Sequence, residues 1–295
     1  MISKISIGTA QFGLDYGVAN LNGKPSFQKS NDIINEAKSS GIYMLDTASA
    51  YGNSESVLGD IGISEFDITT KIPSIPCKEE HIEKFIENII NNSLLNLKIK
   101  KLNTVLVHDS KQLADRKYFN PIYKTLISLK ERNIISKIGV SIYKPSELDK
   151  IKDIYKFDIV QSPLNIVDRR LETSGWVDKL KKNDIEIQAR SIFLQGLLLM
   201  SKNSRPMKFN KWKNLWVSWD DWCLKEDISP ISACLNFILN QEFINSIVLG
   251  VDSKNQLKEI CNCVKNSSNS FPGNLSSDDE FLINPVLWSA LKKND

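Results

Sequence analysis

The 295-residue chain contains few of the residues that build metal centres or disulfide frameworks. It has two histidines and five cysteines, and only Cys261 and Cys263 lie close together. A C-x-C pair without a second cluster does not match a structural zinc site. An odd and scattered set of cysteines indicates reduced thiols. We therefore expect no metal centre and a cytoplasmic protein.

Long hydrophobic runs and an excess of one charge are also missing. No window approaches about 18 consecutive apolar residues, the length of a membrane helix. The N-terminus from Met1 to Ile5 lacks the apolar core of a signal peptide. The 38 basic and 35 acidic residues are interspersed and leave a net charge of +3. This balance argues against a surface for nucleic acid or membrane, so we expect neither as a partner.

What the chain does contain is a regular alternation of short apolar runs with longer helical patterns. The runs typical of strands are Ile5–Ala10, Tyr43–Thr47, Asp67–Ile72, Thr104–His108, Lys137–Ser141, Asp158–Ser162, Glu186–Ser191 and Ser246–Gly250. The helical patterns between and after them include Lys29–Ser40, Glu55–Ile61, Glu79–Leu97, Asn120–Arg132, Pro145–Ile154, Gly175–Lys182, Ile228–Asn240 and Lys254–Val264. Ser253 is a typical N-cap for the last of these helices.

Eight strands separated by helical stretches predict a parallel sheet closed on itself. A TIM barrel needs about 250 residues, so the chain is long enough for one. The first strand runs into Gly8-Thr9-Ala10-Gln11-Phe12-Gly13, which lacks the G-x-G-x-x-G turn of a doubly wound dinucleotide-binding fold. The prediction is an α/β protein with a single (β/α)8 TIM-barrel domain over residues 1–295.

Four tryptophans lie within eleven residues, at positions Trp212, Trp216, Trp219 and Trp222. Three of them, at 212, 216 and 219, fall on one helical face, which favours a stripe that packs on the core. A substrate loop that stacks on a sugar is the alternative.

Polar side chains of four types follow three successive strands. The second strand runs into Asp46, the third ends at Lys71 and the fourth at His108, while Tyr51 lies on the loop after Asp46. The C-terminal ends of the strands carry the active site of a TIM barrel. We therefore expect these four side chains at one opening.

These four types suit the reduction of a carbonyl by hydride transfer, which generates negative charge on oxygen and needs a proton there. A free tyrosine, with a pKa of about 10, can donate that proton. An adjacent ammonium favours the phenolate, so the group can work in both directions. Lys71 can supply the ammonium, Asp46 can hold it charged and oriented, and His108 can donate a hydrogen bond to the carbonyl oxygen.

Each of these residues alone has a simpler interpretation. Asp46 and Lys71 could form a structural ion pair, His108 could be a hydrogen-bonded core residue, and Tyr51 could be a turn aromatic. Their joint occurrence at strand ends favours catalysis. A metal-dependent barrel hydrolase or isomerase would need several histidine or carboxylate ligands there, and a chain with two histidines supplies few.

The segment Asp46–Glu55, with the sequence D-T-A-S-A-Y-G-N-S-E, resembles the signature of the aldo-keto reductase family around its catalytic aspartate and tyrosine. The resemblance continues in the family's order through Thr70-Lys71, Val105–His108, Ile138–Ser141, Gln161–Asn165 and Ile247–Gly250. It implies a catalytic tetrad of Asp46, Tyr51, Lys71 and His108. The implied activity is NAD(P)-dependent interconversion of a carbonyl, in an aldehyde, ketone or sugar, and an alcohol.

The same resemblance implies a nicotinamide cofactor, NADP(H) in preference to NAD(H), that extends across the barrel mouth. Ser141 and Gln161 would hold its carboxamide, and Ser191–Leu198 would pass under the pyrophosphate. The adenosine end would lie along Gly250–Glu259, where a helix N-terminus offers N–H groups to phosphate. The implied cofactor-binding residues are Gly8, Thr9, Asp46, Ser141, Gln161, Arg190, Ser191, Gly196, Gly250, Ser253, Gln256 and Glu259.

Several positions depart from the family's pattern. The family has an asparagine where this chain has Ile142, and an aromatic residue that stacks on the nicotinamide where it has Arg190. It has an arginine for the 2′-phosphate at the position of Gln256, and an asparagine that contacts the adenine at the position of Ile260. Asp252 would repel a 2′-phosphate, whereas Lys254 or Lys258 would attract it. The choice between NADPH and NADH therefore stays open at this point.

A regulatory subunit with the same fold, the same tetrad and very slow turnover is the alternative function. Such a subunit would be expected to carry a partner surface, and no long extra segment provides one. The sequence therefore favours an enzyme.

Overall fold

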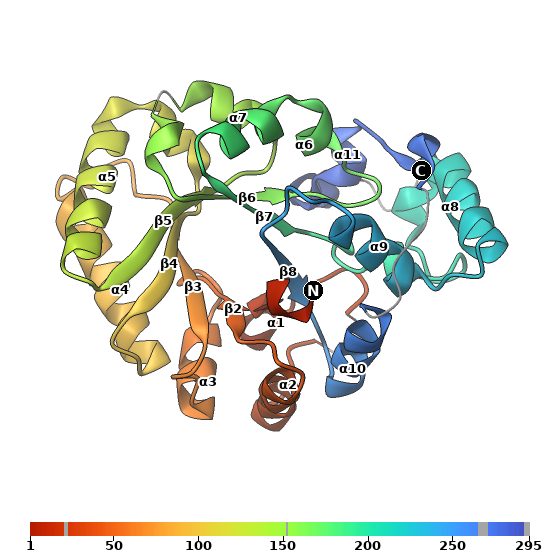
Figure 1. Cartoon of the computed structure of the whole chain (residues 1–295), viewed down its shortest axis with the longest axis horizontal. Coiled ribbons are helices and arrows are strands. Elements are labelled where there is room, and N and C mark those ends of the chain that lie inside the picture. Colours follow the sequence, from red (N-terminus) through yellow and green to blue (C-terminus); the bar gives the residue numbers. More distant parts are fainter. Residues whose placement is uncertain (21–22, 152, 265–270, 292–295) are drawn as a thin grey trace.

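The computed structural model describes residues 1–20, 23–151, 153–264 and 271–291. Its strands form a closed, parallel barrel in chain order, with β8 paired to β1 (Figure 1). The strands are β1 (Ile5–Gly8), β2 (Met44–Asp46), β3 (Asp67–Ile72), β4 (Leu102–Val107), β5 (Ile135–Ser141), β6 (Ile159–Pro163), β7 (Glu186–Arg190) and β8 (Ser246–Gly250). Every predicted strand overlaps an observed one, and the predicted (β/α)8 barrel is confirmed.

The barrel strands are buried on both sides, by the barrel interior and by the outer helices. This burial explains their near-continuous apolar runs rich in Ile and Val. Gly8 pairs with Asp46 and Ser141 pairs with Gln161. Because all strands are parallel, these C-terminal residues meet at the same mouth of the barrel.

Helices surround the sheet (Figure 1). They are α1 (Ala10–Gly13), α2 (Phe27–Ser39), α3 (Ser54–Ile61), α4 (Ile82–Leu97), α5 (Arg116–Glu131), α6 (Arg170–Thr173), α7 (Trp176–Lys182), α8 (Lys213–Lys225), α9 (Pro230–Leu239), α10 (Lys254–Cys263) and α11 (Glu280–Ile283). Short 3-10 helices are η1 (Ile2–Lys4), η2 (Ser110–Ala114), η3 (Pro145–Lys150), η4 (Ile154–Lys156), η5 (Leu197–Leu199), η6 (Met207–Trp212), η7 (Gly273–Leu275) and η8 (Pro285–Ala290). The predicted cap is confirmed, since the Ser253 side chain accepts a hydrogen bond from the Gln256 N–H.

The connection from β5 to β6 differs from the prediction. In place of one helix over Pro145–Ile154, the chain forms the two 3-10 turns η3 and η4. Ile151 stands between them in an extended conformation and is 2% exposed. Seating Ile151 in the core interrupts the helical hydrogen bonds, so tertiary packing overrides the local helical pattern.

The tryptophan-rich segment ends η6 and forms most of α8. Trp216, Trp219 and Trp222 are buried. The indole of Trp216 donates to the Phe209 carbonyl at 2.9 Å, and that of Trp219 donates to the Leu198 carbonyl at 3.2 Å. None of the four tryptophans lines the cavity at the barrel mouth. The core-packing interpretation is confirmed.

Within the residues that the structure describes, no helix is both long and apolar enough to cross a membrane. The same residues contain no group of three histidine, cysteine or acidic side chains placed to hold a metal ion.

Candidate active site

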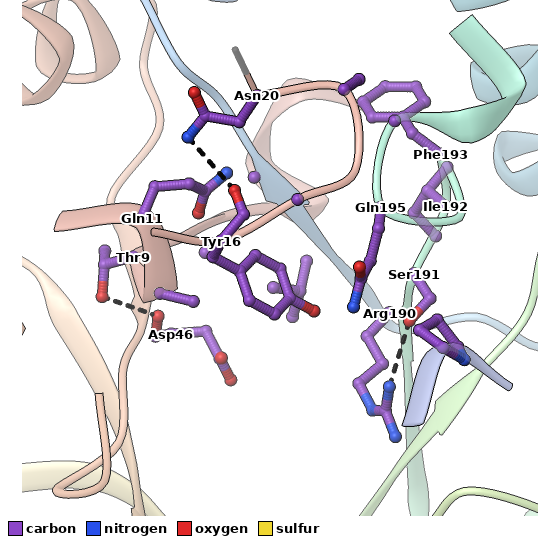
Figure 2. Close-up of a pocket in the computed structure, with 18 of the residues that line it drawn as sticks. Thr9, Gln11, Tyr16, Asn20, Asp46, Arg190, Ser191, Ile192, Phe193 and Gln195 are labelled. Carbon is purple, nitrogen blue, oxygen red and sulfur yellow. Dashed lines mark hydrogen bonds between the residues drawn. The ribbon is translucent and has the colours of Figure 1, made fainter. Parts of the chain in front are cut away.

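A cavity of about 420 Å³ opens at the C-terminal mouth of the barrel. Figure 2 shows residues from the β1 and β2 ends facing residues after β7, with the Tyr16 ring between them. The wall includes most of the residues that the sequence singled out: Gly8, Thr9, Asp46, Tyr51, His108, Ser141, Gln161, Arg190, Ser191, Gly196, Gly250 and Gln256.

Asp46 and Lys71 form a buried ion pair at this mouth. Lys71 Nζ donates to Asp46 Oδ1 at 2.5 Å and to the Thr47 carbonyl at 2.9 Å. Burial lowers the pKa of Lys71, but the Asp46 carboxylate and the Tyr51 side chain raise it more, so the pKa lies above its ordinary value. Lys71 is therefore an ammonium at neutral pH.

Tyr51 and His108 lie beside this ion pair on the cavity wall. Lys71 Nζ is 5.0 Å from the centroid of the Tyr51 ring. The Tyr51 and His108 rings meet edge to face, with their centroids 6.0 Å apart. The Tyr51 loop is held against Gly13, where an added Cβ would lie 1.8 Å from the Tyr51 carbonyl oxygen. The four side chains expected at one opening are brought together.

A hydrogen-bonded chain of amides fixes the other oxygen of Asp46. Gln161 Nε2 donates to Asp46 Oδ2 and to Gln188 Oε1, both at 2.7 Å. Gln161 Oε1 accepts from Ser141 Oγ at 3.0 Å, and Gln188 Nε2 donates to Ser246 Oγ at 3.0 Å. Because both carboxylate oxygens have partners, Asp46 holds one orientation toward Lys71.

The comparisons with known proteins agree with this geometry. A model of the aldo/keto reductase family matches residues 4–270. The chain belongs to this family. Aldo/keto reductases are oxidoreductases that use nicotinamide cofactors, and this chain is therefore an NAD(P)-dependent oxidoreductase in general terms.

Solved structures of aldo-keto reductases share the fold of this family member. The enzyme from Bacillus halodurans, in its holo form, is 18% identical with a TM-score of 0.71, over 90% of this chain and 88% of that chain. A candidate aldo-keto reductase from Pseudomonas aeruginosa is 19% identical with a TM-score of 0.66, over 88% of this chain and 89% of that chain. A comparison with curated proteins found no match.

The mouth of this aldo/keto reductase suits a nicotinamide cofactor. Ser141 Oγ and Gln161 Oε1 lie on the wall near Asp46, and each keeps a lone pair that can accept from the NH2 group of a carboxamide. Gly196, with φ of +86°, packs its Cα against Ala19, and an added Cβ would lie 2.6 Å from the Ala19 Cβ. The glycine thus lets two loops meet beside the cavity.

Two of the expected cofactor residues lie outside the cavity wall. Ser253 caps α10, and Glu259 is exposed further along that helix. Gln256, on the first turn of α10, does line the cavity, whereas Ile260 is fully buried in the core. The α10 end of the cavity is therefore formed by its first turn only.

Several residues of the site were not found by sequence reasoning. Gln188 lies two residues before Arg190. Its polar side chain inside an apolar strand was the signal by which the sequence could have identified it. Tyr16 and Gln195 come from two loops with no periodic pattern. A hydrogen bond from the Val18 N–H to the Gln195 carbonyl, at 3.1 Å, joins these loops. Burial raises the pKa of the Tyr16 phenol, against smaller opposing effects of Arg190 and Gln195.

The His108 imidazole is kept neutral by its surroundings. Burial and then the positive charges of Lys71 and Arg190 lower its pKa to about 4, although Asp109 opposes them. A neutral imidazole at physiological pH can donate one hydrogen bond from its N–H to a substrate oxygen.

We expect His108 to make the free protein less stable at acid pH. The folded pKa of about 4 lies below the reference value of 6.5, so the unfolded chain takes up this proton first. Stability is unaffected above pH 6.5 and falls as the pH drops from 6.5 to 4, by up to about 3 kcal/mol. Urea unfolding of His108→Gln across this range should show a shallower fall than the wild type. The control His81→Gln changes an exposed histidine, and an equal slope in His108→Gln would contradict the prediction.

Proposed function

We propose that this chain interconverts a carbonyl and an alcohol by hydride transfer, with Tyr51 as the general acid or base. The observation that carries the proposal is the buried Asp46–Lys71 pair, whose ammonium lies 5.0 Å from the Tyr51 ring centroid at the cavity wall. In the proposal, residues 1–295 act as one domain. The odd number of scattered cysteines suits work in a reducing cytoplasm.

The residues of the chain handle the proton and the oxygen of the substrate. Tyr51 gives its phenolic proton to the carbonyl oxygen as negative charge develops there, and takes it back in the reverse direction. The Lys71 ammonium stabilises the phenolate that remains, because opposite charges attract strongly in a buried site. His108 donates a hydrogen bond that positions the same oxygen.

A nicotinamide cofactor, when bound, supplies or accepts the hydride. Ser141 and Gln161 would hold its carboxamide, close to Asp46. Gly8, Thr9, Ser191, Gly196 and Gly250 would form the wall along its length.

We propose NADP(H) as the preferred cofactor, with a small margin over NAD(H). Gln256 lines the cavity, but its side-chain oxygen accepts a hydrogen bond from the Asp252 N–H at 2.8 Å. Lys254 and Lys258 could attract a 2′-phosphate, yet both lie within 4 Å of the Glu36 carboxylate, at 3.6 and 3.9 Å. The positive charge at this end is therefore partly neutralised, which keeps the margin small.

Gln256→Arg is expected to strengthen the preference for NADPH. A guanidinium at this position would add a charged, bidentate partner for a 2′-phosphate. We expect the ratio of the NADH to the NADPH dissociation constant to rise about tenfold, on the order of 1.4 kcal/mol. Fluorescence titration measures both constants. Asn183→Arg, which adds the same charge at the end of α7, is the control, and an unchanged ratio in Gln256→Arg would place the 2′-phosphate elsewhere.

The function is tested by titration with NADPH and NADH, followed by turnover with aldehydes, ketones and sugars. Binding of a cofactor together with turnover of at least one carbonyl class is the expected result. Failure to bind either cofactor would reject the proposal. Tight binding without turnover of any carbonyl would favour the slow regulatory subunit instead.

A further inference from the structure

Arg190 places a positive charge in the wall of the candidate active site. Its Nη2 donates to the Ile142 carbonyl at 2.8 Å and its Nη1 donates to Ser191 Oγ at 3.0 Å. The guanidinium carbon lies 4.9 Å from the centroid of the Tyr143 ring. All three partners are neutral. Among the residues that the structure describes, no carboxylate forms an ion pair with Arg190.

The carboxylates that do line the cavity are held elsewhere. Asp46 is bound by Lys71 and Gln161. The Asp252 carboxyl has Gln11 as its hydrogen-bond partner, and burial raises the pKa of that carboxyl against the effect of this bond. Lys71 is fully engaged with Asp46, so Arg190 supplies the uncompensated positive charge of this wall.

Arg190 also retains the hydrogen bonds needed to bind an anion. A guanidinium has five N–H donors, and two are donated to Ile142 and Ser191. The other three have no partner among the described residues. Its carbonyl and ring contacts hold the planar group in place, and such a fork matches the two oxygens of a carboxylate.

The charge of Arg190 acts at the reacting end of the cavity. Together with Lys71 it lowers the pKa of His108, the residue that we propose to contact the carbonyl oxygen. A partly buried, unpaired cation is costly for the free protein. An anionic group on the substrate would compensate that cost on binding.

We infer that Arg190 binds a carboxylate on the substrate, so that the preferred substrates are oxo acids. This inference rests on the proposed carbonyl reduction. One free guanidinium balances one negative charge. A phosphate dianion would need a second cation, and Lys71 is already paired with Asp46. A carboxylate is therefore the better match to this wall.

The test compares pairs of substrates in which one member carries an anionic group and the other is neutral. One arm uses 4-oxobutanoate and 5-oxopentanoate against their methyl esters, and a second arm uses glyceraldehyde 3-phosphate against glyceraldehyde. We expect wild-type kcat/KM to be roughly 10- to 100-fold higher for the acids than for the esters, the range of a charged hydrogen bond. The difference should lie mainly in KM.

Variants of Arg190 assign the effect to its side chain. Arg190→Gln should bring the acid-to-ester ratio close to one. Arg190→Lys should give an intermediate ratio, because an ammonium keeps the charge but loses the bidentate fork. Arg132→Gln removes an exposed arginine paired with Glu87 on the outside of the barrel and should keep the wild-type ratio. Thermal unfolding of each variant verifies that it is folded.

The outcomes separate this inference from the proposed function. If esters and acids are reduced equally well, or if Arg190→Gln keeps the ratio, Arg190 does not bind a carboxylate although carbonyl reduction stands. A stronger preference for the phosphate pair would overturn the carboxylate assignment. Weaker cofactor binding in Arg190→Gln with an unchanged ratio would assign Arg190 to the cofactor. If no carbonyl in either arm is reduced, the proposed function itself fails.

Discussion

Tyr51→Phe is expected to slow carbonyl reduction by about 10²- to 10⁴-fold, the contribution of a positioned general acid. The substitution removes only the phenolic oxygen, so the ring can keep its contacts with Lys71 and His108. We therefore expect the dissociation constant for the cofactor to stay within about twofold of wild type, well below the energy of one hydrogen bond. Single-turnover kinetics with a saturating cofactor measures the chemical step directly.

Tyr43→Phe is the matched control for this experiment. Tyr43 precedes β2 at the opposite end of the barrel, is 47% exposed and packs against Phe66. It should keep wild-type turnover. If Tyr51→Phe also turns over at the wild-type rate, Tyr51 is not the acid or base, and another proton donor in the cavity must serve.

Lys71→Met is expected to lower the free energy of unfolding by about 3–5 kcal/mol, because it leaves the Asp46 carboxylate buried without a counter-ion. Lys71 is 1% exposed and Asp46 is 3% exposed, so little water reaches this ion pair. A typical domain has only about 5–15 kcal/mol in total, and the loss should be obvious in urea unfolding. Carbonyl reduction should fall as well, since the ammonium beside Tyr51 is gone.

Two further variants show whether burial of the charge is the cause. Lys98→Met breaks an ion pair with Asp60 whose side chains are 63% and 56% exposed, and it should cost less than about 1 kcal/mol. The double variant Asp46→Asn with Lys71→Met removes both charges and should recover part of the stability lost in Lys71→Met. If Lys71→Met loses no more free energy of unfolding than Lys98→Met, the Asp46 carboxylate is not left as an uncompensated buried charge.

Much of the barrel could be predicted from the sequence because its strands are local signals. The strands predicted over Asp67–Ile72 and Ser246–Gly250 match the observed bounds of β3 and β8, where most residues are buried. The helix predicted over Pro145–Ile154 failed for the opposite reason. There the local pattern was helical, but the burial of Ile151 against distant core residues decided the backbone.

The residues of the candidate site likewise fall into those with a local sequence signal and those without one. Asp46, Lys71 and His108 were predictable because each follows an apolar strand, and barrel topology brings strand ends to one face. Gln188, Tyr16 and Gln195 were not. Their neighbours in space lie far away in sequence, as where Gln188 bonds Ser246 across 58 residues, and no local pattern encodes such a contact.

The sequence by itself determined the order of strands and helices, the family signature around Tyr51 and the polar residues at the strand ends. Those features depend on side chains close together in the chain. Only the tertiary structure decided that Lys71 is buried against Asp46 with its pKa raised, and that Ser253 and Glu259 lie outside the cavity wall. It also decided that Arg190 forms no ion pair with a carboxylate of the residues described. Burial and charge balance depend on every group that surrounds a side chain, and closing the barrel assembles those groups from all eight strands.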